Sequence, residues 1–256
     1  MTLPVYVVGE ATLTEVAASA SVLLDGPEGR HAVTVRRTRV GETIELVDGA
    51  GTRCRGTVTS IVDPTSLVVE VEQVTREPRP EPTLVVVQAL AKGDRGETAV
   101  ETLTEVGVDE VVPWQAERCV VRWAGEKSSA GVARWRRTAH EAAKQSRRAR
   151  FPVLSEVVST PALLERVRAA SLALVLDEQA HIPITEVVVP RSGDVVVVVG
   201  PEGGISPDEA AALEAAGAVA VRLGPTVLRT STAGTVAAAV LLAASGRWMV
   251  SDGSVQ

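Results

Sequence analysis

Two loops rich in glycine and proline, in the last quarter of the chain, have the residue types best suited to hold a small ligand. Residues 200–204 have the sequence Gly-Pro-Glu-Gly-Gly and follow five consecutive valines, and a second apolar run at 219–223 ends in Gly224-Pro225. Glycine lets a backbone approach a ligand closely and leaves amide N–H groups free to point at it. The loops therefore predict a ligand site, with a pair of tight turns that bind nothing as the alternative.

The elements around these loops place both of them at one edge of a sheet. Apolar strands are predicted at 84–90, 110–113, 172–176, 195–199 and 219–223, and helices at 98–106, 132–148, 161–168, 207–217 and 232–245. The clearest helix start is Ser206-Pro207, with Glu209 three residues after the serine. Such alternation indicates an α/β fold with a mostly parallel sheet covered on both faces. Open α/β sheets bind ligands at the carboxyl ends of their strands.

The N-terminal part has a different pattern, which predicts a separate small β-barrel over residues 1–74. Residues 41–49 alternate polar and apolar and end in Asp48-Gly49, and strand-like runs follow at 53–61 and 67–74. Residues 75–83 contain three prolines, which favour an extended linker. We therefore expect a β-barrel domain at 1–74, a linker at 75–83 and an α/β domain at 84–256.

Composition excludes several classes of protein. The 256 residues are 45% hydrophobic and 23% charged, as in ordinary soluble proteins. No uncharged apolar run approaches the length of a membrane span. Cys54 and Cys119 form no CxxC pair and the three histidines are scattered, so we expect no metal site and a reducing, cytoplasmic environment.

Positive charge is concentrated in two clusters although the net charge is −6. Residues 30–41 contain four arginines and no acid, and residues 134–150 contain seven basic residues and one glutamate. Such clusters on an acidic body suit local contact with a polyanion, with a solvated surface as the alternative. The residues predicted to contact RNA phosphates are Arg30, Arg36, Arg37 and Arg39, and, on one face of a helix, Arg134, Arg137, Lys144 and Arg148.

Longer motifs resemble a known family over the whole chain. The sequence Gly-Pro-Glu-Gly-Gly-Ile-Ser-Pro-Asp-Glu at 200–209, followed by Leu-Gly-Pro-x-Val-Leu-Arg-Thr-x-Thr-Ala at 223–233, resembles the bacterial methyltransferases that modify N3 of a uridine in small-subunit (16S) rRNA. Residues 88–94 and 141–146 look like the two middle signatures of that family. Residues 29–46 look like its N-terminal, PUA-like RNA-binding barrel.

The resemblance implies the trefoil-knotted (SPOUT) fold, S-adenosylmethionine as methyl donor, and a homodimer with its active site at the subunit contact. The Ala-rich helix at 232–245 could form that contact or simply pack on its own sheet. Carried over by position, the cofactor-binding residues would be Leu176, Val199, Gly200, Pro201, Glu202, Gly203, Gly204, Leu223, Gly224, Val227 and Leu228.

Three residues differ from the usual family pattern. Thr226 and Ser231 stand where members often carry Arg and Glu, and Arg147 stands where Gly is common. No scheme that needs a carboxylate at position 231 applies to this chain.

The chemistry expected from the resemblance is methyl transfer to a uracil N3 that must lose its proton. Arg229 is the candidate for stabilising the resulting anion, as donors do in an oxyanion hole, with a phosphate contact or an acid partner as its alternative roles. Glu202 could orient the cofactor, act as a base, or only cap a helix. Because N3 lies on the pairing edge, the target uridine must be unpaired or flipped out.

Two other functions remain possible from the sequence. One is a non-catalytic RNA-binding protein of ribosome assembly, and the other is a knotted methyltransferase that acts on another RNA. The sequence leaves open the proton acceptor, the exact nucleotide, and whether naked rRNA or an assembled subunit is the substrate.

Overall fold

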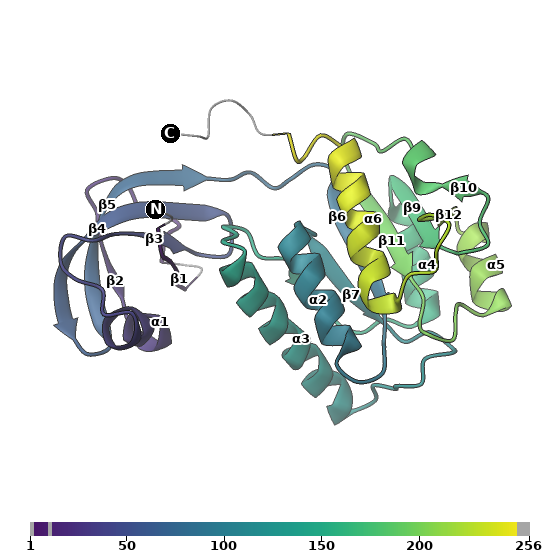
Figure 1. Ribbon diagram of the computed structural model, residues 1–256, viewed down its shortest axis with the longest axis horizontal. Helices are drawn as coiled ribbons and strands as arrows, with labels where there is room; N and C mark the ends of the chain where they lie inside the picture. The colour runs from purple at the N-terminus through teal and green to yellow at the C-terminus, as the bar shows by residue number, and fades with distance from the viewer. Residues whose placement is uncertain (1–2, 10–11, 250–256) are drawn as a thin grey trace. The chain divides into compact units, whose positions relative to one another are not determined.

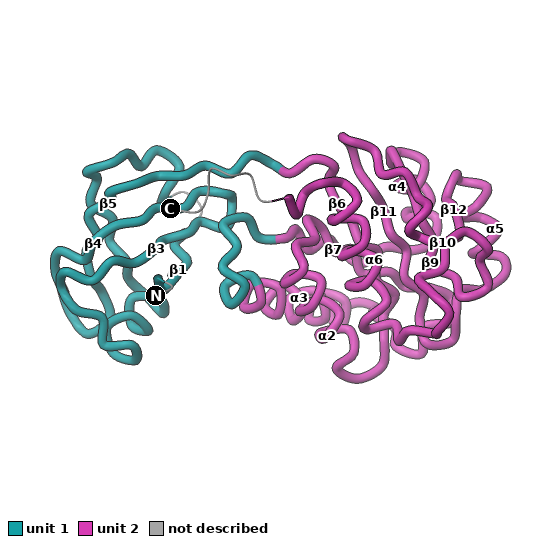
Figure 2. The backbone as a smooth tube through the Cα atoms, turned by 45° about the horizontal axis from the view of Figure 1, so that its top comes forward, with its two compact units in different colours: residues 1–79, 143–151 teal, residues 80–142, 152–256 magenta. Residues whose placement is uncertain are grey.

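The computed structural model describes residues 3–9 and 12–249. Its backbone divides into two compact units, one of residues 1–79 and 143–151 and the other of residues 80–142 and 152–256 (Figure 2). The first unit is therefore built from two stretches of chain. The domain boundaries expected from the sequence stay predictions.

The first unit is a five-stranded sheet with the order β1-β3-β4-β5-β2 (Figure 1). Its elements are β1 (Val5–Val7), β2 (Ser21–Leu24), the short helix α1 (Gly26–Arg30), a π-helical turn (His31–Val35), β3 (Thr43–Val47), β4 (Thr52–Asp63) and β5 (Ser66–Arg76). Strands β3, β4 and β5 pair antiparallel, and β1 pairs parallel to β3. The described residues show no pairing of β1 with β2, so closure into a barrel stays a prediction.

One turn and one close approach between strands shape this sheet. The β3–β4 turn forms where predicted, because the Asp48 carboxylate accepts hydrogen bonds from the backbone N–H groups of Ala50 (2.8 Å) and Thr52 (2.9 Å). A Cβ at Gly56 would lie 2.3 Å from the carbonyl oxygen of Glu70. Only glycine therefore fits at this position, beside the irregularity in β4–β5 pairing at Arg55 and Gly56.

The second stretch of the first unit is attached to it by polar contacts. The Lys144 ammonium lies 2.5 Å from the Glu28 carboxylate, and both side chains are mostly buried. Arg53 Nη2 donates to the carbonyl oxygen of Arg147 at 2.8 Å. The backbone N–H of Phe151 donates to the carbonyl oxygen of Gly49 at 2.8 Å. Residues 143–151 thus complete the first unit.

The second unit is a seven-stranded sheet in the order β10-β12-β9-β11-β6-β7-β8, with every pair parallel. Its strands are β6 (Thr83–Ala89), β7 (Glu110–Trp114), β8 (Val153–Leu154), β9 (Leu172–Leu176), β10 (Ile182–Pro183), β11 (Asp194–Val199) and β12 (Val219–Arg222). Its helices are α2 (Arg95–Val106), α3 (Glu126–Gln145), α4 (Thr160–Ala169), the 3-10 turn Ile184–Glu186, α5 (Pro207–Ala215) and α6 (Thr230–Ala244). The predicted α/β fold with a mostly parallel sheet is confirmed, whereas the trefoil knot stays a prediction.

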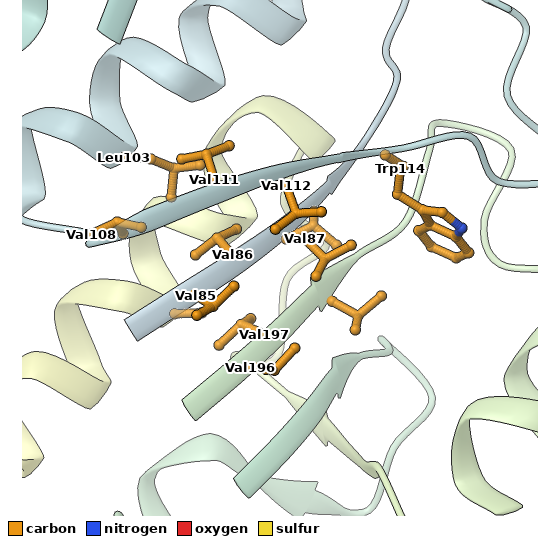
Figure 3. Packing of buried hydrophobic residues seen from close by; sticks show 14 of the residues in the cluster. Val85, Val86, Val87, Leu103, Val108, Val111, Val112, Trp114, Val196 and Val197 are labelled. Atoms are coloured by element: carbon orange, nitrogen blue, oxygen red, sulfur yellow. The ribbon is translucent and has the colours of Figure 1, made fainter. Parts of the chain in front are cut away.

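Small branched side chains fill the core of this unit. Every residue of β6 is buried, as are the five valines of β11, which is the pattern of strands covered on both faces. Figure 3 shows valines of β6, β7 and β11 in one buried cluster that also contains Leu103 of α2. A Cβ at Gly234 of α6 would lie 3.3–3.4 Å from Val199, Leu103 and Val86. The glycine therefore lets α6 pack closely on β6, β11 and α2.

Most predicted elements form within a residue or two of their expected bounds, and the differences have local causes. Helix α3 begins at Glu126, six residues before the predicted start at 132, and ends at Gln145, three residues before the predicted end at 148. The early start was missed because the first turns are polar and carry no apolar periodicity. Strands β8 and β10 are two residues long and leave no alternating pattern to detect. None of the helices in the described residues is long and apolar enough to cross a membrane.

A mostly buried ion pair holds the segment after α6 onto the sheet. Arg247 Nη2 donates to Asp109 Oδ1 at 3.0 Å, and Arg247 Nη1 also donates to the carbonyl oxygen of Pro82 at 3.1 Å. The two side chains are 14% and 8% exposed. Asp109 also accepts a hydrogen bond from the backbone N–H of Leu84. The pair therefore connects the start of β6, the start of β7 and the chain after α6.

We expect Arg247→Ala to lower the free energy of unfolding by about 3 kcal/mol, because it leaves the Asp109 charge buried without its partner. Urea denaturation checks this value. Arg168→Ala is the matched control, because Arg168 pairs with Glu165 on the exposed surface of α4 and its loss should cost no more than about 0.5 kcal/mol. Equal effects of the two substitutions would contradict a structural role for the Arg247–Asp109 pair.

Candidate functional site

A cavity of about 810 Å³ lies at the carboxyl ends of the central strands of the second unit. This volume is in the range of small-molecule sites. Every residue predicted for the cofactor site lines it: Leu176 at the end of β9, residues 199–204 from the end of β11 onward, and Leu223, Gly224, Val227 and Leu228 after β12. The structure thus brings the two glycine loops to one cavity, and their role in binding stays a prediction.

The strand order explains why the cavity forms here. From β6 the chain adds β7 and β8 on one side, whereas β11, β9, β12 and β10 lie on the other side. The order therefore reverses between β6 and β11, which pair in parallel with Val199 beside Gln88. Ligands of open α/β sheets bind at such a switch point.

The first glycine loop has a fixed shape. A Cβ at Gly200 would lie 2.8 Å from Cγ1 of Ile205, so a side chain at 200 would displace the loop. Gly204 has a φ of +73°, which favours glycine, and its N–H donates to the carbonyl oxygen of Pro201 at 2.9 Å. The predicted cap is present, because Ser206 Oγ accepts a hydrogen bond from the backbone N–H of Glu209 at 3.3 Å.

A chain of hydrogen bonds joins the two loops. Thr230, in the first turn of α6, donates from Oγ1 to the carbonyl oxygen of Gly200 at 2.7 Å. Behind it, Gln88 Nε2 donates to Thr230 Oγ1 at 3.1 Å, and the Gln88 side chain is fully buried. Gln88 Oε1 has no hydrogen-bond partner among the described residues. The buried amide therefore fixes α6 against the first loop and leaves one acceptor unused.

The second loop leaves open space beside its backbone. No atom lies within 4 Å of the position that a Cβ would take at Gly224, although the φ of this residue requires no glycine. Since Gly224 lines the cavity, a ligand can approach the backbone there as closely as the loop sequence predicts.

Glu202 is held by the loop after β6. Its Oε1 accepts hydrogen bonds from Arg95 Nη1 at 2.8 Å and from the backbone N–H of Lys92 at 3.2 Å. Partial burial raises the pKa of the Glu202 carboxyl, but the hydrogen bonds from Arg95 and from backbone N–H groups outweigh it, so the net pKa shift is downward. A carboxylate with a lowered pKa is a poor proton acceptor, which favours a positioning role over that of a base.

Arg229 lies where the second loop joins the start of α6. It is the N-cap residue of α6, it lines the cavity and it is exposed. Among the described residues no carboxylate lies within ion-pair distance of its guanidinium. Its charge is therefore available to a ligand, which leaves the anion-stabilising role and the phosphate contact as its candidate roles.

The predicted RNA-contact residues fall into two groups. In the first unit Arg30, Arg36, Arg37 and Arg39 are all exposed, and none forms an ion pair with an acid in the described ranges. On α3, Arg134 pairs with Glu97 and Lys144 pairs with Glu28. Arg148 lies beyond the end of α3 at Gln145, contrary to the predicted helix face, and its Nε donates to the carbonyl oxygen of Arg150 at 2.9 Å. Arg137 is exposed. Acids far away in the sequence thus neutralise part of the predicted basic face.

Several cavity residues were missed by the sequence motifs. Arg95, Arg118 and the segment 177–179 line the cavity, and they follow the carboxyl ends of β6, β7 and β9. That shared position is the signal that could have identified them. Within residues 3–9 and 12–249, no cluster of side chains could hold a metal ion.

The sequence matches two families along its length. Residues 78–242 match the RNA methyltransferase domain, and residues 24–72 match the RNA methyltransferase PUA domain. The Ribosomal RNA small subunit methyltransferase E of Mycobacterium tuberculosis is 48% identical over 241 residues, which cover 93% of this chain and 91% of that protein. The chain belongs to the ribosomal RNA small subunit methyltransferase E family.

More distant members of this methyltransferase E family agree with that assignment. The Bacillus subtilis protein of the same name is 32% identical over 88% of this chain and 90% of its own length. The crystal structure of the Neisseria gonorrhoeae enzyme bound to S-adenosyl methionine has a TM-score of 0.82 at 26% identity and covers 94% of this chain and 98% of that one. The PUA-like N-terminal part and the methyltransferase part expected from the sequence are thus confirmed.

We expect Thr230→Val to lower the free energy of unfolding by about 2 kcal/mol, because it leaves the Gly200 carbonyl and the Gln88 amide without their buried partner. Thr232→Val is the control two residues further along α6, since Thr232 is exposed and its Oγ1 donates, within the described residues, to the carbonyl oxygen of Arg229 alone. Chemical denaturation of both variants measures the difference. A Thr230→Val variant as stable as the Thr232→Val control would show that the hydrogen bonds of Thr230 contribute nothing to the free energy of unfolding.

Proposed function

We propose that this chain is an S-adenosylmethionine-dependent methyltransferase that modifies N3 of an unpaired uridine in 16S rRNA, and so acts in ribosome biogenesis in the cytoplasm. The observation that carries the proposal is the cavity at the switch point, which is built from the loops that hold the family's motifs. The relatives named as small-subunit rRNA methyltransferases support the choice of substrate.

The residues of the cavity fit the methyl donor. Its volume of about 810 Å³ exceeds that of an adenosyl group, and the side chains of Leu176, Val199, Leu223 and Leu228 supply apolar walls. The open space beside Gly224 would accept a group that a Cβ would exclude. When bound, S-adenosylmethionine supplies an electrophilic methyl group on a sulfonium. The chain's own residues then have to orient the uracil and stabilise the charge left when N3 loses its proton.

Arg229 is the residue that we assign to this charge. Loss of the N3 proton spreads negative charge over the two uracil carbonyl oxygens, and a preorganised cation beside them stabilises that charge. Arg229 lines the cavity without an acid partner in the described part of the chain. Glu202 is assigned a positioning role, because it ties the first glycine loop to Arg95 and Lys92.

The RNA contacts proposed for the chain are the residues whose charge remains available. These are the exposed arginines of the first unit, Arg30, Arg36, Arg37 and Arg39, together with Arg137 of α3. We also propose a homodimer, in which α6 would use the face that it does not pack on its own sheet. Val236 on that helix is 38% exposed, and Trp248, which follows it, is 50% exposed.

The proposal is tested with labelled methyl donor and small ribosomal subunits that lack the modification, with the modified nucleoside mapped by mass spectrometry. We expect transfer to a uridine N3 with the wild-type protein. Arg229→Ala should lower kcat about 10²- to 10³-fold, as loss of one oxyanion donor does, and leave the Kd for S-adenosylmethionine within about twofold.

Arg222→Ala is the control for that experiment, because Arg222 is exposed on β12 and does not line the cavity. RNA binding without any methyl transfer or donor binding by the wild-type protein would instead support the non-catalytic assembly protein. A full-rate Arg229→Ala variant would remove Arg229 from the chemistry.

Glu202→Gln separates the positioning role of Glu202 from that of a base. Because the pKa of Glu202 is lowered from the ordinary 4.5, its ion pair with Arg95 is complete above that value and is lost only as the pH falls through the lowered pKa. We expect the variant to retain the pH profile of the wild type between about pH 6 and pH 8, with a loss of kcat below about tenfold. Loss of most activity together with one limb of the profile would identify Glu202 as the base.

A further inference from the structure

Arg118 is a third arginine of the cavity, and neither glycine loop contains it. It lies on the loop between β7 and α3, and the Gln115 side chain closes that loop. Gln115 Nε2 donates to the carbonyl oxygen of Val121 at 3.0 Å, and its Oε1 accepts from the backbone N–H of Trp123 at 2.8 Å. The Nε2 and Oε1 atoms of the Gln115 side chain thus hold the loop in a single shape around Arg118.

A buried carboxylate fastens the same loop to the cofactor side of the cavity. Glu209 is 6% exposed and accepts hydrogen bonds at Oε1 from the backbone N–H of Glu117 (2.9 Å) and from Thr160 Oγ1 (2.7 Å). It lies in the first turn of α5, where the helix dipole favours a negative charge. Since α5 begins directly after the first glycine loop, Glu209 holds Arg118 in a fixed position relative to that loop.

Arg118 also lies close to the first glycine loop. A Cβ at Gly203 would lie 3.4 Å from both the Cβ and the carbonyl oxygen of Arg118. Arg118 Nη1 donates to the carbonyl oxygen of Gly203 at 3.3 Å, which is long for a hydrogen bond. The base of the side chain is therefore fixed, whereas its guanidinium makes a single long hydrogen bond within the described part of the chain.

The charge of Arg118 is not compensated within the described residues. Arg95 on the same cavity is paired with Glu202 at 2.8 Å, whereas no carboxylate lies within 4.0 Å of the Arg118 guanidinium in the parts of the chain that are described. The side chain is exposed to solvent. The cavity thus has a preformed cation at its outer rim, on a braced loop that needs no ligand to set its shape.

We propose that Arg118 binds a backbone phosphate of the RNA next to the uridine that enters the cavity. The inference rests on the proposed function, because it takes RNA as the substrate. A rim cation would repel the sulfonium of the methyl donor, whereas the guanidinium fork matches the oxygens of a phosphate. An exposed arginine reaches a group that arrives from solvent, and a braced loop loses little freedom when it binds.

The test compares Arg118→Ala, Arg118→Lys and the control Arg222→Ala, because Arg222 is exposed on β12, does not line the cavity and lies outside the loop that carries Arg118. For Arg118→Ala we expect the KM for small-subunit RNA to rise about 10- to 100-fold, with kcat within about threefold of the wild type and the Kd for S-adenosylmethionine unchanged. The slope of log affinity against log salt should fall by about one phosphate contact. Lysine should restore part of the affinity, since a point charge also binds phosphate.

The outcomes separate this inference from the proposed function. A wild-type protein that transfers no methyl group overturns the proposed function, and the salt slope of RNA binding still tests Arg118 in that case. An unchanged KM and slope in Arg118→Ala overturn the inference. A rise in the Kd for S-adenosylmethionine that matches the rise in KM also overturns it, because it would place Arg118 on the donor. Circular dichroism and the melting temperature show that each exposed-site variant is folded.

Discussion

The hydrogen bond from Thr230 to the carbonyl oxygen of Gly200 is the interaction on which the cavity depends. It joins the loop after β11 to the start of α6, and the buried Gln88 supports it from the neighbouring strand. A peptide carbonyl at the end of a buried strand has to be paired, because an unpaired one costs about 1–3 kcal/mol. The pairing therefore keeps the two glycine loops together even when nothing lies between them.

Charge around the cavity follows a consistent pattern. Arg95 is neutralised by Glu202, whereas Arg118 and Arg229 have no acid partner in the described ranges. The paired arginine ties two loops of the protein to each other. The two unpaired arginines lie where an incoming polyanion could meet them. Burial and ion pairing thus distinguish groups that shape the site from groups that are available to a substrate.

The sequence predicted those features that depend on neighbouring residues. Five valines before Gly200 identify β11, and the Ser206 cap marks the start of α5 because its geometry is local. The first turns of α3 were missed because they are polar.

Features that depend on strand order could not be predicted in the same way. Arg118, on the loop after β7, contacts the first glycine loop after β11, and Glu97 and Glu28 reach α3 from distant parts of the chain. The family's motifs identified the cofactor residues, but they contain no information about which arginines are neutralised.

The discontinuous first unit has a consequence for biosynthesis. Residues 143–151 supply Lys144 to Glu28, and Arg150 Nη2 donates to the carbonyl oxygen of Glu77 at 2.7 Å. A ribosome that has translated only the N-terminal sheet has therefore not yet made the segment that completes it. More than sixty further residues must be translated before that segment is available. The maturation of the two units is therefore coupled during synthesis. A fragment that ends at the proline-rich linker lacks part of its own structure.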